Sequence, residues 1–156
     1  MRIAVVGLGK IGLPLAASFA QAGNEVVGVD VNQETVTLVN EAKEPFPGEA
    51  GLQEALEVVV LGGQLRATSD YAEAIPGAEA IVVVVPLFVD QVTGEPDFDW
   101  MDAATASLAE HITPGTLVVY ETTLPVGTTR NRWKPMIQEI SGLEEGEDFH
   151  LAFSPE

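Results

Sequence analysis

The sequence has no cysteine, few basic residues and few aromatic ones, and each scarcity excludes some classes of protein. Without cysteine, these residues supply neither a disulfide framework nor a thiolate site. Only 7 Lys and Arg stand against 24 Asp and Glu, which gives a formal net charge of -17 at pH 7. Nucleic acid and anionic membranes are therefore poor partners. Two interpretations of the acid excess remain open, an ordinary acidic domain and adaptation to high salt.

Long apolar runs are also lacking, since none approaches the roughly 20 residues that a membrane-spanning helix needs. The opening MRIAVVGLGKIG is only superficially similar to a signal peptide, because glycines and a helical period follow its apolar stretch. A cytoplasmic protein is expected. At 156 residues, with 46% hydrophobic but only 6% aromatic residues, the chain suits one domain with an aliphatic core.

Short apolar runs alternate with helical patterns along the chain. The run AIVVVV at 80–85 shows no polar alternation, which is typical of a parallel strand covered on both faces. The order of elements predicts right-handed βαβ units and a doubly wound parallel sheet in three α/β/α layers. Strands are predicted over 2–6, 25–30, 65–68, 80–85, 117–123 and 149–156, and helices over 11–22, 33–42, 52–61, 70–75, 100–112 and 130–140.

Capping residues mark several of the predicted helix ends. Asn32 and Ser69 are expected to be N-caps, and Thr128 or Thr129 is expected to cap the last helix. Pro135 should kink or shorten that helix, because proline lacks the N–H that a helix interior needs. The segments between these elements are predicted to be loops, at 43–51, 86–99 and 143–148.

A glycine motif follows the first predicted strand. Gly7, Gly9 and Gly12 form G-x-G-x-x-G between a strand and a helix, and Asp30 ends the next strand, at about the 20-residue distance typical of dinucleotide sites. Gly7 permits a tight turn, Gly9 lets a pyrophosphate approach the backbone, and Gly12 lets the helix pack closely on the sheet. The context favours a Rossmann-type dinucleotide site over a purely structural glycine turn.

Asp30 also indicates which dinucleotide binds. Its carboxylate can accept hydrogen bonds from the adenosine ribose, but it would repel a 2′-phosphate, and the following VNQE offers no basic residue. NAD is therefore favoured over NADP, while the loop alone leaves FAD open. Lys10 is either a phosphate contact or a solvated lysine. The residues of the loop and strand expected to bind the cofactor are Gly7, Leu8, Gly9, Lys10, Ile11, Gly12 and Asp30.

Three later segments reach the carboxyl edge of the predicted sheet, where ligands bind in this fold. They are VVPLF at 84–88, ETTLPVGTT at 121–129 and FSPE at 153–156, and each changes there from apolar to proline-bearing. Hydroxyls at a strand end can bond a ribose or a reacting oxygen without adding charge. Proline and glycine fix the turn that aims those hydroxyls.

In chain order, RIAVVGLGKIGLPLA, FPGEAGL, LRATSD, ETTLPVGTT and FSPE resemble the N-terminal domain of the UDP-glucose/GDP-mannose dehydrogenase family. The resemblance covers essentially all 156 residues. The glycine loop is generic, but the last two segments are specific and similar to the family's Ser-Thr-Val-Pro-x-Gly-Thr and Asn/Ser-Pro-Glu motifs. The resemblance implies a nucleotide-sugar 6-dehydrogenase of polysaccharide biosynthesis. Such an enzyme oxidises the 6-hydroxymethyl group of a UDP- or GDP-sugar to a carboxylate with two NAD, and hydrolyses a cysteine-bound thioester at the end.

Carried over residue by residue, the resemblance implies further site residues. Val85 and Pro86 would lie near NAD, and Thr122 and Thr123 would face its nicotinamide side. Thr123 would also position a catalytic water, and Glu156 would serve substrate binding and proton transfer. Thr123 and Glu156 are thus the candidate catalytic residues, against the alternatives of a turn cap and a frayed terminus.

The chain also departs from the family pattern. Leu87 stands where the family often has a threonine, so one hydroxyl contact to the cofactor is not expected, and Thr122 replaces a common serine. The family's lysine, asparagine, cysteine and second acid belong to later regions that these residues do not contain. The isolated chain is therefore expected to bind NAD without oxidising a sugar, and the full-length enzyme is expected to be a homodimer.

Two other functions fit parts of the pattern. The cofactor domain of a 3-hydroxyacid or 6-phosphogluconate type dehydrogenase shares the fold but carries different segments after the fifth strand. A non-catalytic NAD-sensing module would need neither the Thr-Pro turn nor the Pro-Glu end. His111 and His150 show no partner pattern, and no metal-ligand spacing occurs, so no metal site is expected. The identity of the sugar stays open.

Overall fold

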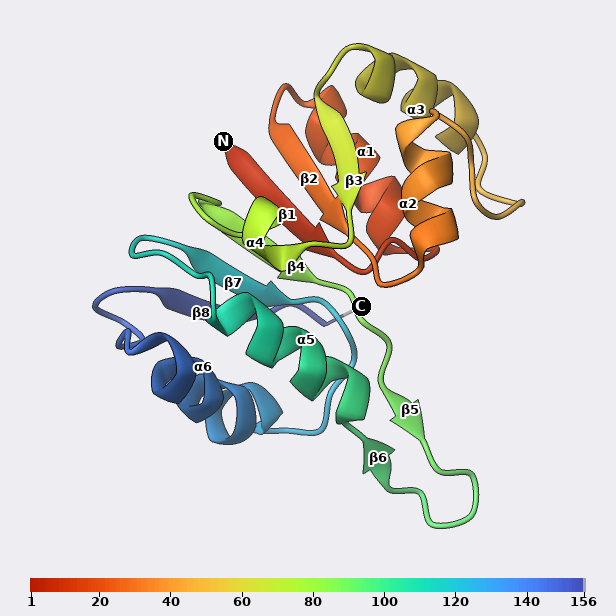
Figure 1. Ribbon diagram of the computed structural model, residues 1–156. Helices are drawn as coiled ribbons and strands as arrows, with labels where there is room; N and C mark the ends of the chain where they lie inside the picture. Colours follow the sequence, from red (N-terminus) through yellow and green to blue (C-terminus); the bar gives the residue numbers. More distant parts are fainter. Residues whose placement is uncertain (156) are drawn as a thin grey trace.

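Six parallel strands form one sheet with helices on both faces in the computed structural model, which describes residues 1–155 (Figure 1). The strands are β1 (Arg2–Val6), β2 (Glu25–Val29), β3 (Leu65–Thr68), β4 (Ala80–Val83), β7 (Leu117–Tyr120) and β8 (His150–Phe153), in the order β3-β2-β1-β4-β7-β8. The order reverses between β1 and β4, which confirms the predicted doubly wound, Rossmann-type sheet.

The helices divide between the two faces of the sheet. They are α1 (Gly12–Gln21), α2 (Gln33–Asn40), α3 (Leu52–Leu61), α4 (Tyr71–Ala74), α5 (Asp99–Ala109) and α6 (Lys134–Ser141). A π-helix, η1 (Thr129–Trp133), directly precedes α6, and a small hairpin of β5 (Phe88–Val89) and β6 (Pro96–Asp97) precedes α5. Figure 1 shows this hairpin projecting from the body of the molecule. Among the helices of residues 1–155, none combines the length and apolarity needed to cross a bilayer.

The core has two halves, one on each face of the sheet. Val5 and Val82 pack under α1 and α3, whereas Val6 and Val83 pack against α5 and its neighbours. Because successive strand residues point to opposite faces, a strand buried on both sides needs apolar residues throughout. This explains the unbroken apolar run at 80–85. Each such side chain contributes about 1.5–3 kcal/mol when it is fully buried.

The predicted caps are confirmed at one helix and wrong at another. Asn32 caps α2, because its side-chain oxygen accepts the N–H of Glu34 at 3.0 Å. Ser69 was expected to cap α4, but Asp70 does so by accepting the N–H of Ala72 at 2.8 Å. Asp70 lies one residue nearer the helix, so its carboxylate reaches the second helical N–H, which is the position an N-cap satisfies.

The last predicted helix consists of a π-helix followed by an α-helix. The α-helix begins only at Lys134, with Pro135 in its first turn, so the expected shortening is confirmed. Residues 129–133 form the π-helix η1 instead. This arrangement avoids the clash of the proline ring with the carbonyl of the preceding helical turn. The expected threonine cap is wrong, because the Thr128 hydroxyl donates to the carbonyl oxygen of Pro125 at 2.8 Å.

Several predicted boundaries also shift. The strand predicted at 80–85 ends at Val83, and the one predicted at 117–123 ends at Tyr120. The predicted loop 86–99 contains the β5–β6 hairpin, whose turn is closed by Asp90, since its carboxylate accepts the N–H groups of Val92 and Thr93. An aspartate that caps its own turn is a signal that could have identified this hairpin from the sequence.

Candidate functional site

The glycine loop joins β1 to α1 at the carboxyl edge of the sheet. A side chain at Gly12 would place its Cβ 1.8 Å from the carbonyl oxygen of Gly7, so helix and turn pack too closely for any other residue. Gly7 itself has φ +96°, a left-handed conformation that favours glycine. A Cβ at Gly9 would meet nothing within 4 Å. The backbone is therefore open to a ligand at Gly9, beside the N–H groups of the first turn of α1.

Asp30 lies directly after β2 and holds the glycine loop in place. One carboxylate oxygen accepts the N–H of Leu8 at 2.8 Å, and the other accepts the N–H of Asn32 at 2.8 Å. This bracing role was missed by sequence reasoning, because nothing in the sequence pairs Asp30 with the Leu8 amide. A carboxylate oxygen has two lone pairs, so each can accept a second hydrogen bond from a ribose hydroxyl.

A cleft of roughly 390 Å³ opens beside these residues. It brings together five of the predicted cofactor-binding residues, Gly7, Gly9, Asp30, Val85 and Pro86. It adds a set of residues that sequence reasoning missed, namely Val6, Val29, Val31, Tyr71, Val84, Trp100, Ala103, Ala104 and Ser107. The floor comes from the ends of β1, β2 and β4, and one wall comes from α5. The other predicted loop residues lie outside it, with Leu8 buried in the core and Lys10 and Ile11 exposed on the loop.

Tyr71 lies beside Asp30 in this cleft. Its partial burial, and secondarily the charge of Asp30, raise the pKa of Tyr71 to about 12. Both effects disfavour the phenolate. The side chain therefore stays neutral at physiological pH and can donate a hydrogen bond to a ligand.

The Thr-Pro turn after β7 meets the same edge of the sheet. Thr122 donates its hydroxyl hydrogen to the carbonyl oxygen of Val85 at 2.9 Å, which ties the end of β7 to a wall of the cleft. The Thr122 hydroxyl therefore donates to the protein backbone, and the Thr128 hydroxyl does so further along the turn. Thr123 is exposed on this turn. Neither Thr122 nor Thr123 lines the cleft, and Glu156 lies outside the described residues.

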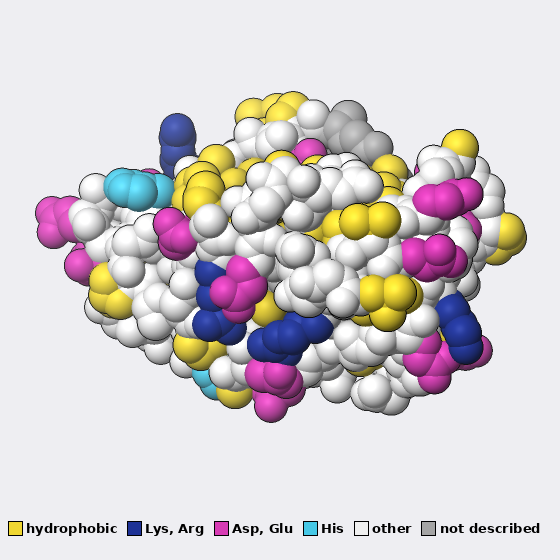
Figure 2. All heavy atoms as spheres, turned by 90° about the horizontal axis from the view of Figure 1, so that it is seen from above, with side chains coloured by type: hydrophobic (Ala, Val, Ile, Leu, Met, Phe, Trp, Pro, Cys, Tyr) yellow, Lys and Arg dark blue, Asp and Glu magenta, His cyan; other side chains and the backbone are white. Residues whose placement is uncertain are grey.

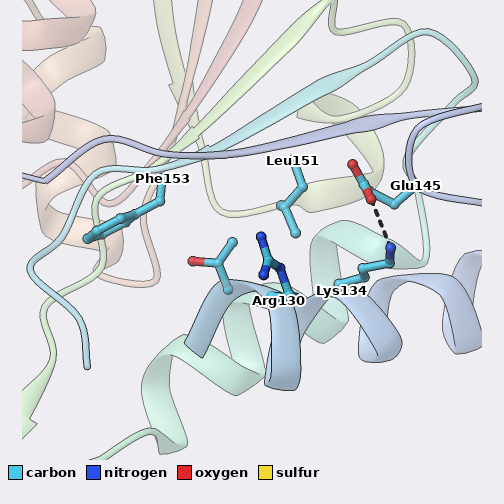
Figure 3. Close-up of a pocket in the computed structure, with 6 residues that line it drawn as sticks. Arg130, Lys134, Glu145, Leu151 and Phe153 are labelled. Carbon is cyan, nitrogen blue, oxygen red and sulfur yellow. Dashed lines mark hydrogen bonds and ion pairs between the residues drawn. The ribbon is translucent and has the colours of Figure 1, made fainter. Parts of the chain in front are cut away.

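A second cavity of roughly 310 Å³ lies between η1, α6 and β8 (Figure 3). It is lined by Thr129, Arg130, Lys134, Glu145, Leu151 and Phe153, none of which was predicted to bind the cofactor. Lys134 pairs with Glu145 at 2.9 Å within it. Within residues 1–155, no group of three or more His, Asp or Glu is arranged to hold a metal ion.

The family profile of the UDP-glucose/GDP-mannose dehydrogenase family, NAD binding domain, matches residues 1–156. The chain belongs to this family. A UDP-N-acetyl-D-mannosamine dehydrogenase of Pyrococcus horikoshii is 37% identical over 158 residues, covering 100% of this chain and 36% of the relative. A GDP-mannose 6-dehydrogenase of Pseudomonas syringae pv. syringae is 35% identical, with 100% and 36% covered.

Solved structures of family members have the same fold. A ternary complex of GDP-mannose dehydrogenase from Pseudomonas aeruginosa superposes with a TM-score of 0.94 at 30% identity, covering 100% of this chain and 36% of that one. The UDP-D-ManNAc dehydrogenase of Pyrococcus horikoshii gives 0.92 at 35% identity, with 100% and 36% covered. The family match confirms the resemblance and identifies NAD as the cofactor of this domain. The chain spans about a third of the length of these relatives.

Proposed function

We propose that residues 1–156 form the NAD-binding domain of a cytoplasmic nucleotide-sugar dehydrogenase of polysaccharide biosynthesis. The enzyme would oxidise the 6-hydroxymethyl group of a UDP- or GDP-linked sugar to a carboxylate. The observation that carries this proposal is one continuous edge of the sheet, which carries in order the Asp30 carboxylate after β2, the open Gly9 after β1 and the Thr-Pro turn after β7. The relatives named above act on UDP-N-acetyl-D-mannosamine and GDP-mannose, which gives the class of substrate.

The residues around the cleft support one orientation of NAD. The Leu8 N–H is already bonded to Asp30, so the pyrophosphate would take its hydrogen bonds from N–H groups at Gly9 and beyond, and we assign the exposed Lys10 of this loop to a phosphate contact. Asp30 would accept from the adenosine ribose. Val85 and Pro86 would then border the nicotinamide half. When bound there, NAD supplies the acceptor for a hydride from the sugar carbon.

The Thr-Pro turn would aim the reacting groups at this half of the cleft. The bond from Thr122 to Val85 fixes the start of the turn against the cleft wall, so the next residue, Thr123, is held in a defined place. We assign Thr123 to positioning the water that reacts with the oxidised sugar, and Glu156 to substrate binding and proton transfer. A hydroxyl suits the first task because it both donates and accepts without adding charge.

Binding of NAD to the chain tests the cofactor assignment. Gly9→Val should weaken NAD binding at least tenfold in calorimetry, because the added side chain would occupy the space where a pyrophosphate approaches. The fold should survive, since a Cβ at Gly9 meets no protein atom within 4 Å. Ala50→Val adds similar bulk on an exposed loop away from the cleft and should leave NAD affinity within twofold. Equal affinities for the two variants would contradict the site.

Catalysis tests the assignment of the reaction. Residues 1–156 alone should form no NADH from a panel of UDP- and GDP-sugars, since the sugar-binding residues that the family has in later regions are not among them. They also contain no cysteine to carry the second oxidation through a thioester. In a complete dehydrogenase carrying this domain, Thr123→Ala and Glu156→Gln should each lower turnover, and Glu156→Gln should leave the Kd for NAD within twofold. Steady NADH formation by the chain alone, followed by absorbance, would overturn the proposal that this domain binds NAD but needs other parts of the enzyme to oxidise the sugar.

A further inference from the structure

The α5 face that borders the cleft has an unusual composition. Trp100, Ala103, Ala104 and Ser107 follow one another at the spacing that places residues on a single face of a helix, and all four line the cleft. Three of them are small and leave room beside the helix. The other, Trp100, is a large aromatic residue in the first turn of the helix. The face thus has an open stretch with an aromatic ring at its end.

Trp100 is held outward although exposure of its ring to water is unfavourable. Its exposed fraction is 61%, whereas the other tryptophan, Trp133, is fully buried. The Phe88 ring of the hairpin meets it edge-on, with ring centroids 4.9 Å apart and an interplanar angle of 85°. Phe88 is itself 48% exposed. The β5–β6 hairpin therefore supports the indole from one side and leaves the rest of its surface accessible.

The order of groups along the cleft fixes which part of NAD reaches this wall. With the pyrophosphate at Gly9 and the adenosine ribose at Asp30, the adenine must continue beyond Asp30, away from the glycine loop. Val31 and Tyr71 lie beside Asp30, and the α5 face lines the same cleft. The opposite end leads along Val85 to the Thr-Pro turn, which suits the nicotinamide.

Charge around Trp100 supports the same assignment. Asp97 and Asp99 flank the start of α5, and their carboxylates would repel a phosphate. Adenine is uncharged at neutral pH and presents two flat faces, which suit an aromatic ring and small apolar residues. Tyr71, which stays protonated, adds a neutral hydrogen-bond donor at this end.

We propose that Trp100 is a cofactor-binding residue that packs on the adenine of NAD, and that Phe88 positions its ring. This inference rests on the proposed NAD orientation. The β5–β6 hairpin then acts as the support of the adenine-binding wall.

The experiment compares NAD, ADP-ribose and nicotinamide mononucleotide by calorimetry on the whole chain. Trp100→Ala should weaken NAD and ADP-ribose by about tenfold, within the range of one base–aromatic stacking contact, and leave nicotinamide mononucleotide unchanged. Trp100→Phe should keep most of the affinity. Phe88→Ala should weaken ADP-ribose by about threefold in the unaltered chain and not at all in the Trp100→Ala background, because its effect passes through the indole. Val92→Ala, at the exposed hairpin tip, is the matched control.

A second measurement needs no variant. Acrylamide quenches an exposed tryptophan, so the quenchable emission of this chain comes from Trp100. Saturating ADP-ribose should shield it, and nicotinamide mononucleotide should not. Unchanged ADP-ribose affinity in both Trp100 variants, or shielding by the mononucleotide instead, would overturn the proposal. Failure of the unaltered chain to bind either NAD or ADP-ribose would overturn the NAD site itself, which is a distinguishable result.

Discussion

At the scale of single residues, Asp30 joins the stability of the loop to the choice of cofactor. Its carboxylate accepts two backbone N–H groups, one from the glycine loop and one from the start of the next helix. Removing the acceptors would leave those donors without partners, at about 1–3 kcal/mol for each one that water cannot reach. The same negative charge would disfavour a ribose phosphate. A substitution at Asp30 is therefore expected to change both stability and specificity.

The unaltered chain should bind NAD at least tenfold more tightly than NADP, a difference of about 1.4 kcal/mol. Asp30→Ala should narrow that gap by removing the repulsion of the 2′-phosphate, and it should also lower the melting temperature. Asp30→Asn keeps one acceptor and should narrow the gap with a smaller loss of stability. Calorimetry with both dinucleotides measures the first effect, and thermal unfolding measures the second. Equal affinities for NAD and NADP in the unaltered chain would refute the role of Asp30.

At the scale of elements, Asp102 joins α5 to the π-helix η1. It forms an ion pair with Arg132 and accepts the indole N–H of Trp133 at 2.9 Å. Trp133 stacks on Tyr120 with ring centroids 4.2 Å apart, and the Tyr120 hydroxyl meets that of Thr105 at 2.6 Å. The π-helix η1 directs the consecutive residues Arg132 and Trp133 to the same carboxylate. This cluster fixes η1, and with it the far end of the Thr-Pro turn.

Asp102→Ala should lower the free energy of unfolding by about 1–3 kcal/mol, because the buried Trp133 N–H loses its acceptor. The hydrogen bond from Arg132 holds the pKa of Asp102 below its usual range. A carboxyl with a depressed pKa stabilises the fold above its ordinary pKa, and that contribution is lost as pH falls through the lowered value. The difference between variant and unaltered chain should therefore shrink in acid. Denaturant unfolding measures this difference in the free energy of unfolding, with Glu110→Ala, an exposed acid at the other end of α5, as the control.

The sequence predicted the elements better than their ends. Apolar runs and capping residues depend on neighbours along the chain, so the sheet, the glycine loop and the Asn32 cap could be inferred directly. The π-helix η1 depends on Pro135 together with tertiary packing. The β5–β6 hairpin depends in the same way on the turn that Asp90 closes. Trp100 could not be inferred at all, because only the fold brings α5 beside Asp30. The bond from Thr122 to Val85 likewise joins segments far apart in sequence.

At the scale of the whole molecule, the acid excess is a property of the surface. Figure 2 shows acidic side chains spread across the visible face, with basic ones lying against some of them. Most of the scarce basic side chains are engaged in ion pairs, as in Lys43 with Glu41, Arg66 with Glu73 and Lys134 with Glu145. Exposed pairs of this kind contribute little, about 0–1 kcal/mol each. The net charge of -17 is the excess that remains after every basic side chain has been counted, so these pairs leave all of it uncompensated.

The two interpretations of this negative charge predict different dependences of the melting temperature on salt concentration. Self-repulsion is largely screened once the Debye length falls to about 8 Å, near 0.15 M salt. An ordinary acidic domain should therefore gain melting temperature up to about that concentration and then level off. Adaptation to high salt, which we expect, requires the melting temperature to keep rising well into molar KCl. A chain with Glu54→Gln, Glu110→Gln and Glu139→Gln, three exposed acids on separate elements, should be more stable than the unaltered chain at low salt and lose that advantage in molar KCl. A melting temperature that is flat or falls between low and molar KCl would exclude the high-salt interpretation.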